Sequence, residues 1–187
     1  MTRRRRLLFA LALALASAAC ATRPVAPAPT WPLLGPSALG ESQQVRQVLH
    51  AAYGATTVGL QCVVTVTPDG LEVVGVTALG QRAFTVEYDG EHVKAERAPQ
   101  MPATVDPARL VNDLELVYWP LAALESALSP LGWTVSEPFA GTRRLTRDGH
   151  LIAEVHYADA HPWSGRVWLS NFAAHYSLSI ESAPLAP

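Results

Sequence analysis

Tight turns between runs of alternating apolar and polar residues place the strongest constraint on the fold of this chain. The turn sequences are Pro68-Asp69-Gly70, Asp89-Gly90 and Asp148-Gly149. Asp-Gly dipeptides favour the two-residue turns that join neighbouring antiparallel strands. Between such turns, apolar residues alternate with polar ones, as Phe84 and Val86 do with Thr85 and Glu87. This period of two predicts antiparallel strands with one buried face and one wet face.

Nine strands are predicted, in two runs that flank a helical segment. The first run comprises residues 58–66, 71–77, 81–88 and 92–97, and the second comprises residues 133–137, 142–147, 150–157, 166–169 and 176–181. The helical segment starts at Asp106, a suitable N-cap, with Pro107 at the first helical position. Pro120 interrupts the helical spacing and opens a second short helix. The apolar stripes are Leu110, Val111, Leu114 and Val117 in the first helix and Leu121, Leu124 and Leu128 in the second.

A further amphipathic helix is predicted over Glu41 to Tyr53. Val45, Val48, Leu49 and Ala52 share one face at helical spacing, and Gly54 stands where a helix C-terminal glycine belongs. The predicted fold class is therefore α+β: a curved antiparallel sheet with this N-terminal helix and the central helical pair over its concave face.

The first residues have the three parts of a secretory signal. Arg3 to Arg6 are basic, residues 7–16 are apolar, and small residues precede Cys20. The apolar run is about half the length that a membrane-spanning helix needs. We therefore expect residues 1–19 to be a signal peptide, residues 20–40 to be a proline-rich tether, residues 41–183 to be a single domain, and residues 184–187 to be a tail.

Ser17-Ala18-Ala19-Cys20 resembles the bacterial lipobox, although Ser17 stands where Leu is usual. The resemblance implies that Cys20 is acylated and anchors the chain in a membrane facing the periplasm. Ala21, rather than Asp, after the cysteine favours the outer membrane. Two alternatives remain: a soluble periplasmic protein with an ordinary signal peptide, and a disulfide from Cys20 to Cys62. Otherwise, the apolar surroundings of Cys62 predict a buried thiol.

The charge balance argues against nucleic acid as a partner. Without the four arginines of the signal, ten of the 14 basic residues stand against 16 acidic residues. The negative mature chain lacks the basic patch that nucleic-acid binding requires. Adhesion to anionic lipid by surface charge is disfavoured for the same reason.

The order of elements resembles the LolA/LolB lipoprotein-carrier fold, and shorter motifs resemble an uncharacterised lipoprotein family, domain of unknown function 3261. The motifs are Asp113 to Leu124, Arg144 to Gly149, and Asn171 to Leu178. The resemblance implies that the curved sheet is an open, incomplete β-barrel, with helices as a lid over an apolar cavity. It also implies a link to aryl-polyene pigment gene clusters, a lipid-like ligand such as an acyl or polyene chain, and an envelope carrier protein as a possible partner.

Two sets of candidate site residues follow. The cavity lining is predicted to be apolar residues on the inward faces of strands and helices: Val64, Phe84, Val86, Leu114, Leu121, Val155 and Leu178. A membrane or partner contact is predicted at a loop tryptophan, a methionine and a cationic rim: Trp163, Met101, Arg143, Arg144 and Arg147. The alternative for the arginines is a solvated strand face, and for most tryptophans a place in the core.

No catalytic, cofactor or metal site is predicted. The six histidines lack zinc-ligand spacing, although His156, Asp159 and His161 could meet at a metal. Serine nucleophile, P-loop and dinucleotide motifs are not found. The expectation is a non-enzymatic lipoprotein that binds a lipid-like molecule. A scaffold lipoprotein with a filled core that binds an envelope protein is the alternative.

Overall fold

The computed structural model describes residues 30–99, 101 and 106–185, and these residues form one antiparallel sheet of ten strands around a short helix. The order across the sheet is β5-β4-β3-β2-β1-β10-β9-β8-β7-β6, so β5 and β6 are the end strands and the sheet is not closed. The strands are β1 (Gln43–Tyr53), β2 (Thr56–Thr67), β3 (Gly70–Val76), β4 (Arg82–Tyr88), β5 (Val93–Arg97), β6 (Trp133–Phe139), β7 (Thr142–Arg147), β8 (His150–Tyr157), β9 (Arg166–Asn171) and β10 (Tyr176–Pro184).

All nine predicted strands are present, and the Asp148-Gly149 hairpin is confirmed in detail. Asp148 and Gly149 both have positive φ, 51° and 78°, between β7 and β8. Two positive φ values at the central positions define the turn whose twist matches that of the flanking strands. Each run of strands is therefore a meander, and β1 joins the two runs by pairing with β2 on one side and β10 on the other.

The predicted helix over residues 41–53 is wrong, because these residues form β1. The buried side chains alternate strictly along it: Val45, Gln47, Leu49 and Ala51. Val48, which the helical stripe requires on the buried face, is 39% exposed. Hydrogen-bond pairing with both neighbouring strands outweighs local helical preference, since a central strand satisfies its backbone groups on two sides.

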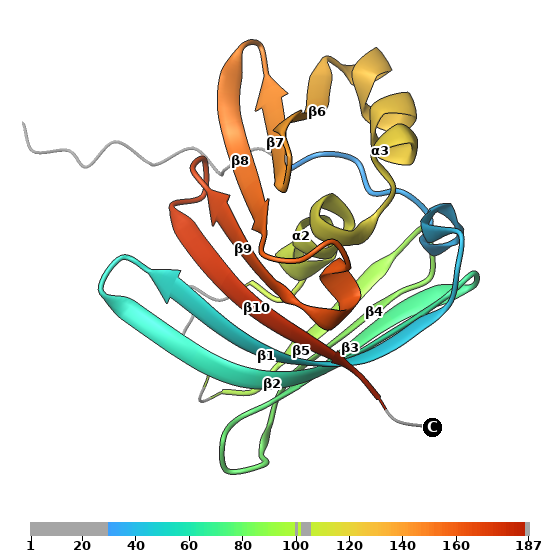
Figure 1. The fold of residues 1–187 in the computed structure, drawn as a ribbon. Helices are drawn as coiled ribbons and strands as arrows, with labels where there is room; N and C mark the ends of the chain where they lie inside the picture. Colours follow the sequence, from blue (N-terminus) through green and yellow to red (C-terminus); the bar gives the residue numbers. More distant parts are fainter. Residues whose placement is uncertain (1–29, 100, 102–105, 186–187) are drawn as a thin grey trace, which may run out of the picture.

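Of the two α-helices described, one lies inside the curve of the sheet and the other stands beside its end strand β6 (Figure 1). They are α2 (Arg109–Tyr118) and α3 (Leu121–Leu128), and Pro120 separates them as predicted. Residues 110–119 are all buried, so α2 is covered on every side rather than on one stripe. Helix α3 packs against β6 at the end of the sheet. No described helix is long and apolar enough to cross a membrane.

The last part of the predicted tether packs on the domain. We call residues 30–40 the N-terminal strap; it includes the 3₁₀ helix η2 (Pro36–Leu39). Trp31, Leu34 and Leu39 are buried, and the Trp31 ring lies edge-to-face against Trp133 of β6 at 6.0 Å. At its other end, η2 contacts β2 and β3. The strap therefore runs between distant strands of the sheet (Figure 1) and belongs to the folded domain.

Gly75 in β3 offers a test of the packing between β3 and β4. A Cβ atom built on Gly75 would lie 2.4 Å from Cε1 of the buried Phe84 ring, at a register shift between the two strands. We expect Gly75→Ala to lower the free energy of unfolding by about 1–3 kcal/mol, because the ring must move within a packed core. Denaturant titration measures the change. Gly59→Ala is the control, since there the nearest atom is 3.3 Å away in the exposed His50 ring; an equal loss in both variants would contradict the argument.

Candidate functional site

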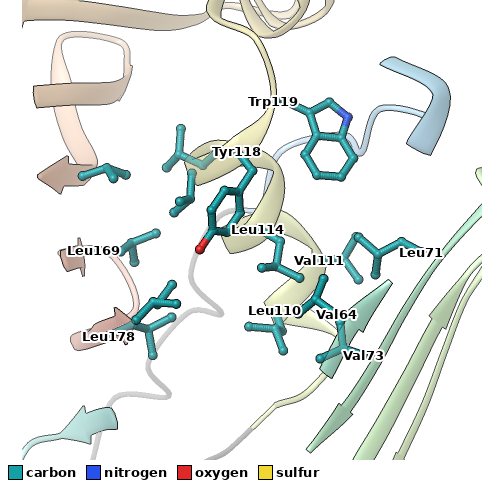
Figure 2. Close-up of a cluster of buried hydrophobic side chains, with 14 of the residues drawn as sticks. Val64, Leu71, Val73, Leu110, Val111, Leu114, Tyr118, Trp119, Leu169 and Leu178 are labelled. Carbon is teal, nitrogen blue, oxygen red and sulfur yellow. The ribbon is translucent and has the colours of Figure 1, made fainter. Parts of the chain in front are cut away.

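The predicted cavity-lining residues belong to the packed interior of the protein. Val64, Val86, Leu114 and Val155 are at most 1% exposed, Phe84 and Leu178 are also buried, and Leu121 is partly buried. Figure 2 shows side chains of α2 between Leu169 and Leu178 on one side and Val64 and Val73 on the other. The side chains of α2 therefore fill the space between these two groups of strand residues.

Polar groups on α2 join the helix to the sheet. The Gln47 amide of β1 donates to the Tyr118 hydroxyl at 2.8 Å and to Ser182 Oγ of β10 at 3.1 Å. The Tyr176 hydroxyl of β10 donates to the Asp113 carboxylate at 2.7 Å. Burial raises the pKa of Asp113 to about 7, although the bond from Tyr176 opposes the shift. Buried hydrogen bonds of this kind fix one position of α2 within the sheet.

A second set of polar groups on α2 holds the strap. The Asn112 amide donates to the Trp31 carbonyl at 2.9 Å, and the Leu34 N–H donates to the Glu115 carboxylate at 3.1 Å. Glu115 is fully buried, and burial raises its pKa to about 8. Asn112 and Glu115 are three residues apart, so both project from one face of the helix. The strap thus depends on α2 for its position.

Arg143 caps the C-terminal end of α2. Its Nη1 donates to the carbonyls of Leu116 and Trp119, both at 2.8 Å, and its Nε and Nη2 donate to Glu137 at 3.0 and 2.8 Å. The side chain is 9% exposed. Arg143 is therefore an interior residue that satisfies helix-end carbonyls, and it does not lie on the cationic rim that the sequence predicts.

Next to Arg143 lies a hollow of about 320 Å³, which we call the α2 pocket. Its lining is Leu39, Glu41, Val117, Tyr118, Trp119, Pro120, Glu137, Gly141, Thr142, Arg143, Tyr157, Asp159, Ala160, Pro162 and Trp163. These residues come from the end of the strap, the end of α2, β6 to β8, and the 3₁₀ helix η4 (Pro162–Ser164). Its volume lies at the lower end of the range of small-molecule sites.

Aromatic rings form much of the wall of the α2 pocket. The Trp163 ring stacks on the Tyr118 ring, with centroids 3.8 Å apart and planes 15° apart. The Tyr157 hydroxyl donates to the Val117 carbonyl at 2.7 Å, and burial raises its pKa to about 12. These contacts hold the rings in place, so the pocket has a preformed shape. Trp163 is half-buried in this wall rather than free at a loop tip.

The other predicted contact residues lie apart from the α2 pocket. Met101 is buried. Arg144 binds Glu154, which also contacts His156 Nε2 at 2.8 Å, and Arg147 lies over the Trp133 ring at 4.7 Å. Arg144 and Arg147 thus belong to the surface of β7 and do not converge with Trp163. Cys20 lies outside the described residues, whereas Cys62 is buried as predicted, which raises the pKa of its thiol to about 12.

Of the residues that line the α2 pocket, only Arg143 and Trp163 were predicted from the sequence as site residues, and Glu41, Tyr118, Tyr157 and Asp159 were not assigned to a site of this kind. Tyr118 and Trp119 were available as adjacent aromatic residues at the end of a predicted helix. Glu41 and Asp159 lie in segments 118 residues apart with no shared periodicity, so only the folded chain brings them to one pocket.

Two further hollows lie elsewhere on the sheet. One, of about 540 Å³, is lined by residues of β2 to β5. The other, of about 350 Å³, is lined by residues of β1, β2, β9 and β10, among them the predicted cavity residue Leu178.

Comparison with known proteins gives the family but no activity. No curated protein matches the chain. A solved structure that resembles it is that of a DUF1329 family protein from Desulfovibrio piger, with 9% sequence identity over 79% of this chain and 87% of that chain, and a TM-score of 0.33. That similarity is too low to carry an argument. The model of the family described as "Protein of unknown function (DUF3261)" matches residues 44–184, three quarters of the sequence and nearly all of the sheet, and the chain therefore belongs to the DUF3261 family.

Proposed function

We propose that this protein is an envelope lipoprotein, anchored through Cys20 and facing the periplasm, that binds a lipid-like molecule between its sheet and its helices. The sheet would then be an open barrel of the LolA/LolB-like type, with α2, α3 and the strap as the cover of its concave face. The observation that carries the proposal is the α2 pocket. It is preformed, of ligand size, and bounded by aromatic rings where the cover meets the sheet.

The arrangement of the pocket suits an amphiphile. Its inner wall includes the buried apolar side chains of Leu39 and Val117, one from the strap and one from α2. Its outer wall includes charged residues such as Glu137 and Asp159. An apolar chain that enters between the strap and α2 would leave water, and this burial would drive binding without covalent chemistry or a cofactor. An acyl or polyene chain is the proposed cargo.

The proposal predicts that lipid co-purifies with the protein. The full chain, expressed in an envelope that makes acyl and polyene lipids, would be extracted and its bound lipids identified by mass spectrometry. Trp163→Ala, which removes a ring from the aromatic wall, is expected to reduce the bound lipid about tenfold or more. Trp168→Ala is the control, because Trp168 lies on β9, does not line the α2 pocket and is 42% exposed. Equal lipid in both variants would contradict the proposal.

Anchoring is tested with the same preparation. Cys20→Ser is expected to move the protein from the membrane fraction to the soluble periplasmic fraction. The acyl chains on Cys20 would hold the protein in the bilayer, whereas its negative surface charge would not attract it to anionic lipid. Fractionation and intact mass measure the change and the added acyl mass. An unchanged membrane fraction, or a wild-type mass without acyl chains, would contradict the anchor.

The filled interior favours a second candidate, a scaffold lipoprotein that binds an envelope protein. Trp119, Leu116 and Leu124 are fully buried. In this candidate, such side chains fill the interior at all times and leave no space for a ligand. Exposed apolar side chains on the outer face of the sheet, including Val48, Val63 and Trp168, would supply the contact surface. This candidate predicts no bound lipid in wild-type protein and loss of a protein partner in Trp168→Ala.

A further inference from the structure

The charges around the α2 pocket bear on the kind of head group that it can accept. Four titratable side chains line it besides the tyrosines: Glu41, Glu137, Asp159 and Arg143. A buried arginine beside a lipid pocket at first suggests an anionic head group, such as a carboxylate or a phosphate. The hydrogen bonds of Arg143 exclude that simple reading.

Arg143 is already occupied. Four of its five N–H groups are used by the carbonyls at the end of α2 and by Glu137, and Glu137 also balances its charge. An anionic ligand would have to compete with Glu137 Oε1, which already accepts two N–H groups of Arg143, and with the carbonyls at the end of a buried helix. The Arg143–Glu137 pair therefore leaves the pocket without an available positive charge.

Since Arg143 and Glu137 neutralise each other, the carboxylates of Glu41 and Asp159 give the pocket a negative net charge. Within the described residues, neither has a cationic side chain within 4 Å. Glu41 accepts a hydrogen bond from the Gln43 amide at 2.8 Å. Asp159 lies directly over Gly165, where a Cβ atom would be 2.5 Å from its Oδ2. The absence of a side chain at Gly165 thus lets Asp159 approach the loop that carries Trp163.

The aromatic rings that line the same pocket are a second group that can attract a cation. Rings of Tyr and Trp attract cations through the negative faces of their π systems, and such rings recur in sites for alkylated ammonium groups. Tyr157 already lies beside one cation, the Arg143 guanidinium, at 5.7 Å from the ring centroid. Trp163 is held by its stacking on Tyr118 and lines the pocket.

We propose that the α2 pocket is a head-group site for an ammonium: the ring of Trp163 and the carboxylates of Glu41 and Asp159 receive the cation, while the attached chain enters along Leu39 and Val117. This inference rests on the proposed lipid-binding function and specifies its ligand as an amine-bearing amphiphile. The charge of the pocket, and not its size, then makes anionic amphiphiles the weaker ligands.

The test compares probes of equal chain length on the full chain carrying Cys20→Ser. The probes are dodecyltrimethylammonium, dodecanoate and the chain-free tetramethylammonium ion, each below its micelle concentration, with titration calorimetry and tryptophan fluorescence as readouts. We expect the cationic amphiphile to bind about tenfold tighter than dodecanoate or more. The double variant Glu41→Gln, Asp159→Asn is expected to bring the two affinities to within about threefold.

A matched control separates the pocket from the general negative charge of the protein. Glu125→Gln with Asp148→Asn removes the same charge from exposed residues that do not line the α2 pocket, and should keep the tenfold preference. Loss of the preference in this control, or equal binding of both amphiphiles to the wild type, would overturn the ammonium site but not lipid binding. Binding of tetramethylammonium as tightly as the amphiphile would support the ammonium site and overturn the lipid function. No binding of any probe would overturn both.

Discussion

Glu115→Gln is expected to make the protein more stable at alkaline pH and to flatten much of the dependence of its stability on pH. Glu115 is fully buried on α2, and its carboxylate receives the Leu34 N–H of the strap. Burial raises its pKa from the ordinary 4.5 to about 8. The folded protein therefore holds this proton more tightly than the unfolded chain does. Glutamine has nearly the same shape and is neutral at every pH.

The sign of the effect follows from proton linkage. Because the folded-state pKa is raised, the stabilisation is complete below about pH 4.5, falls as the pH rises, and is lost above about pH 8. One pKa unit corresponds to about 1.4 kcal/mol, so the loss from Glu115 between pH 5 and pH 9 is on the order of 2–4 kcal/mol. Asp113, whose pKa burial raises to about 7, adds a loss of the same sign that the variant retains.

Urea titrations of wild type and Glu115→Gln at pH 5, 7 and 9 measure this difference. The two proteins should be similar at pH 5, and the variant should be the more stable at pH 9. Glu125→Gln on the neighbouring helix α3 is the control, because Glu125 is exposed; its effect should stay within about 0.5 kcal/mol at each pH. A pH profile of Glu115→Gln parallel to that of the wild type would show that Glu115 titrates normally in the folded protein.

Arg143→Ala is expected to lower the free energy of unfolding by about 2–5 kcal/mol, because each buried carbonyl that loses its donor costs about 1–3 kcal/mol. The substitution leaves carbonyls at the end of α2 and the Glu137 carboxylate without their donor. Arg143→Lys should recover only part of the loss, since one ammonium cannot reach both sets of acceptors in the geometry of the guanidinium fork.

Arg147→Ala is the matched control for this prediction. Arg147 lies on the same strand, β7, but its side chain is 46% exposed and its ion pair with Asp148 is long, at 3.9 Å. Its loss should therefore change the stability by about 0.5 kcal/mol or less, apart from a small contribution from its contact with the Trp133 ring. Chemical denaturation of the three variants gives the comparison. Similar effects of Arg143→Ala and Arg147→Ala would contradict the assignment of Arg143 as the helix cap.

The sequence predicts helix α2 and its apolar face, but not the burial of its polar residues. The stripe Leu110, Val111, Leu114 and Val117 predicts α2 and its apolar face correctly. The stripe does not predict that Asn112, Asp113 and Glu115 are buried as well, because polar residues normally mark the wet side of a helix. Their partners lie in the strap and in β10, more than sixty residues away in sequence. Their burial is therefore decided by tertiary contacts.

Short-range sequence patterns were sufficient to predict the elements that depend on neighbouring residues. The alternation of apolar and polar residues and the Asp-Gly turns predicted nine strands and their arrangement in two meanders. These two signals depend only on residues a few positions apart, so they can be recognised in the sequence. Only the tertiary structure decided that residues 43–53 form the central strand β1, which joins the two meanders into one sheet. Helical and strand patterns overlap in that segment, and pairing with both β2 and β10 selects the strand. The α2 pocket was likewise decided by tertiary structure, because its carboxylates and rings become neighbours only when the sheet has curved around α2.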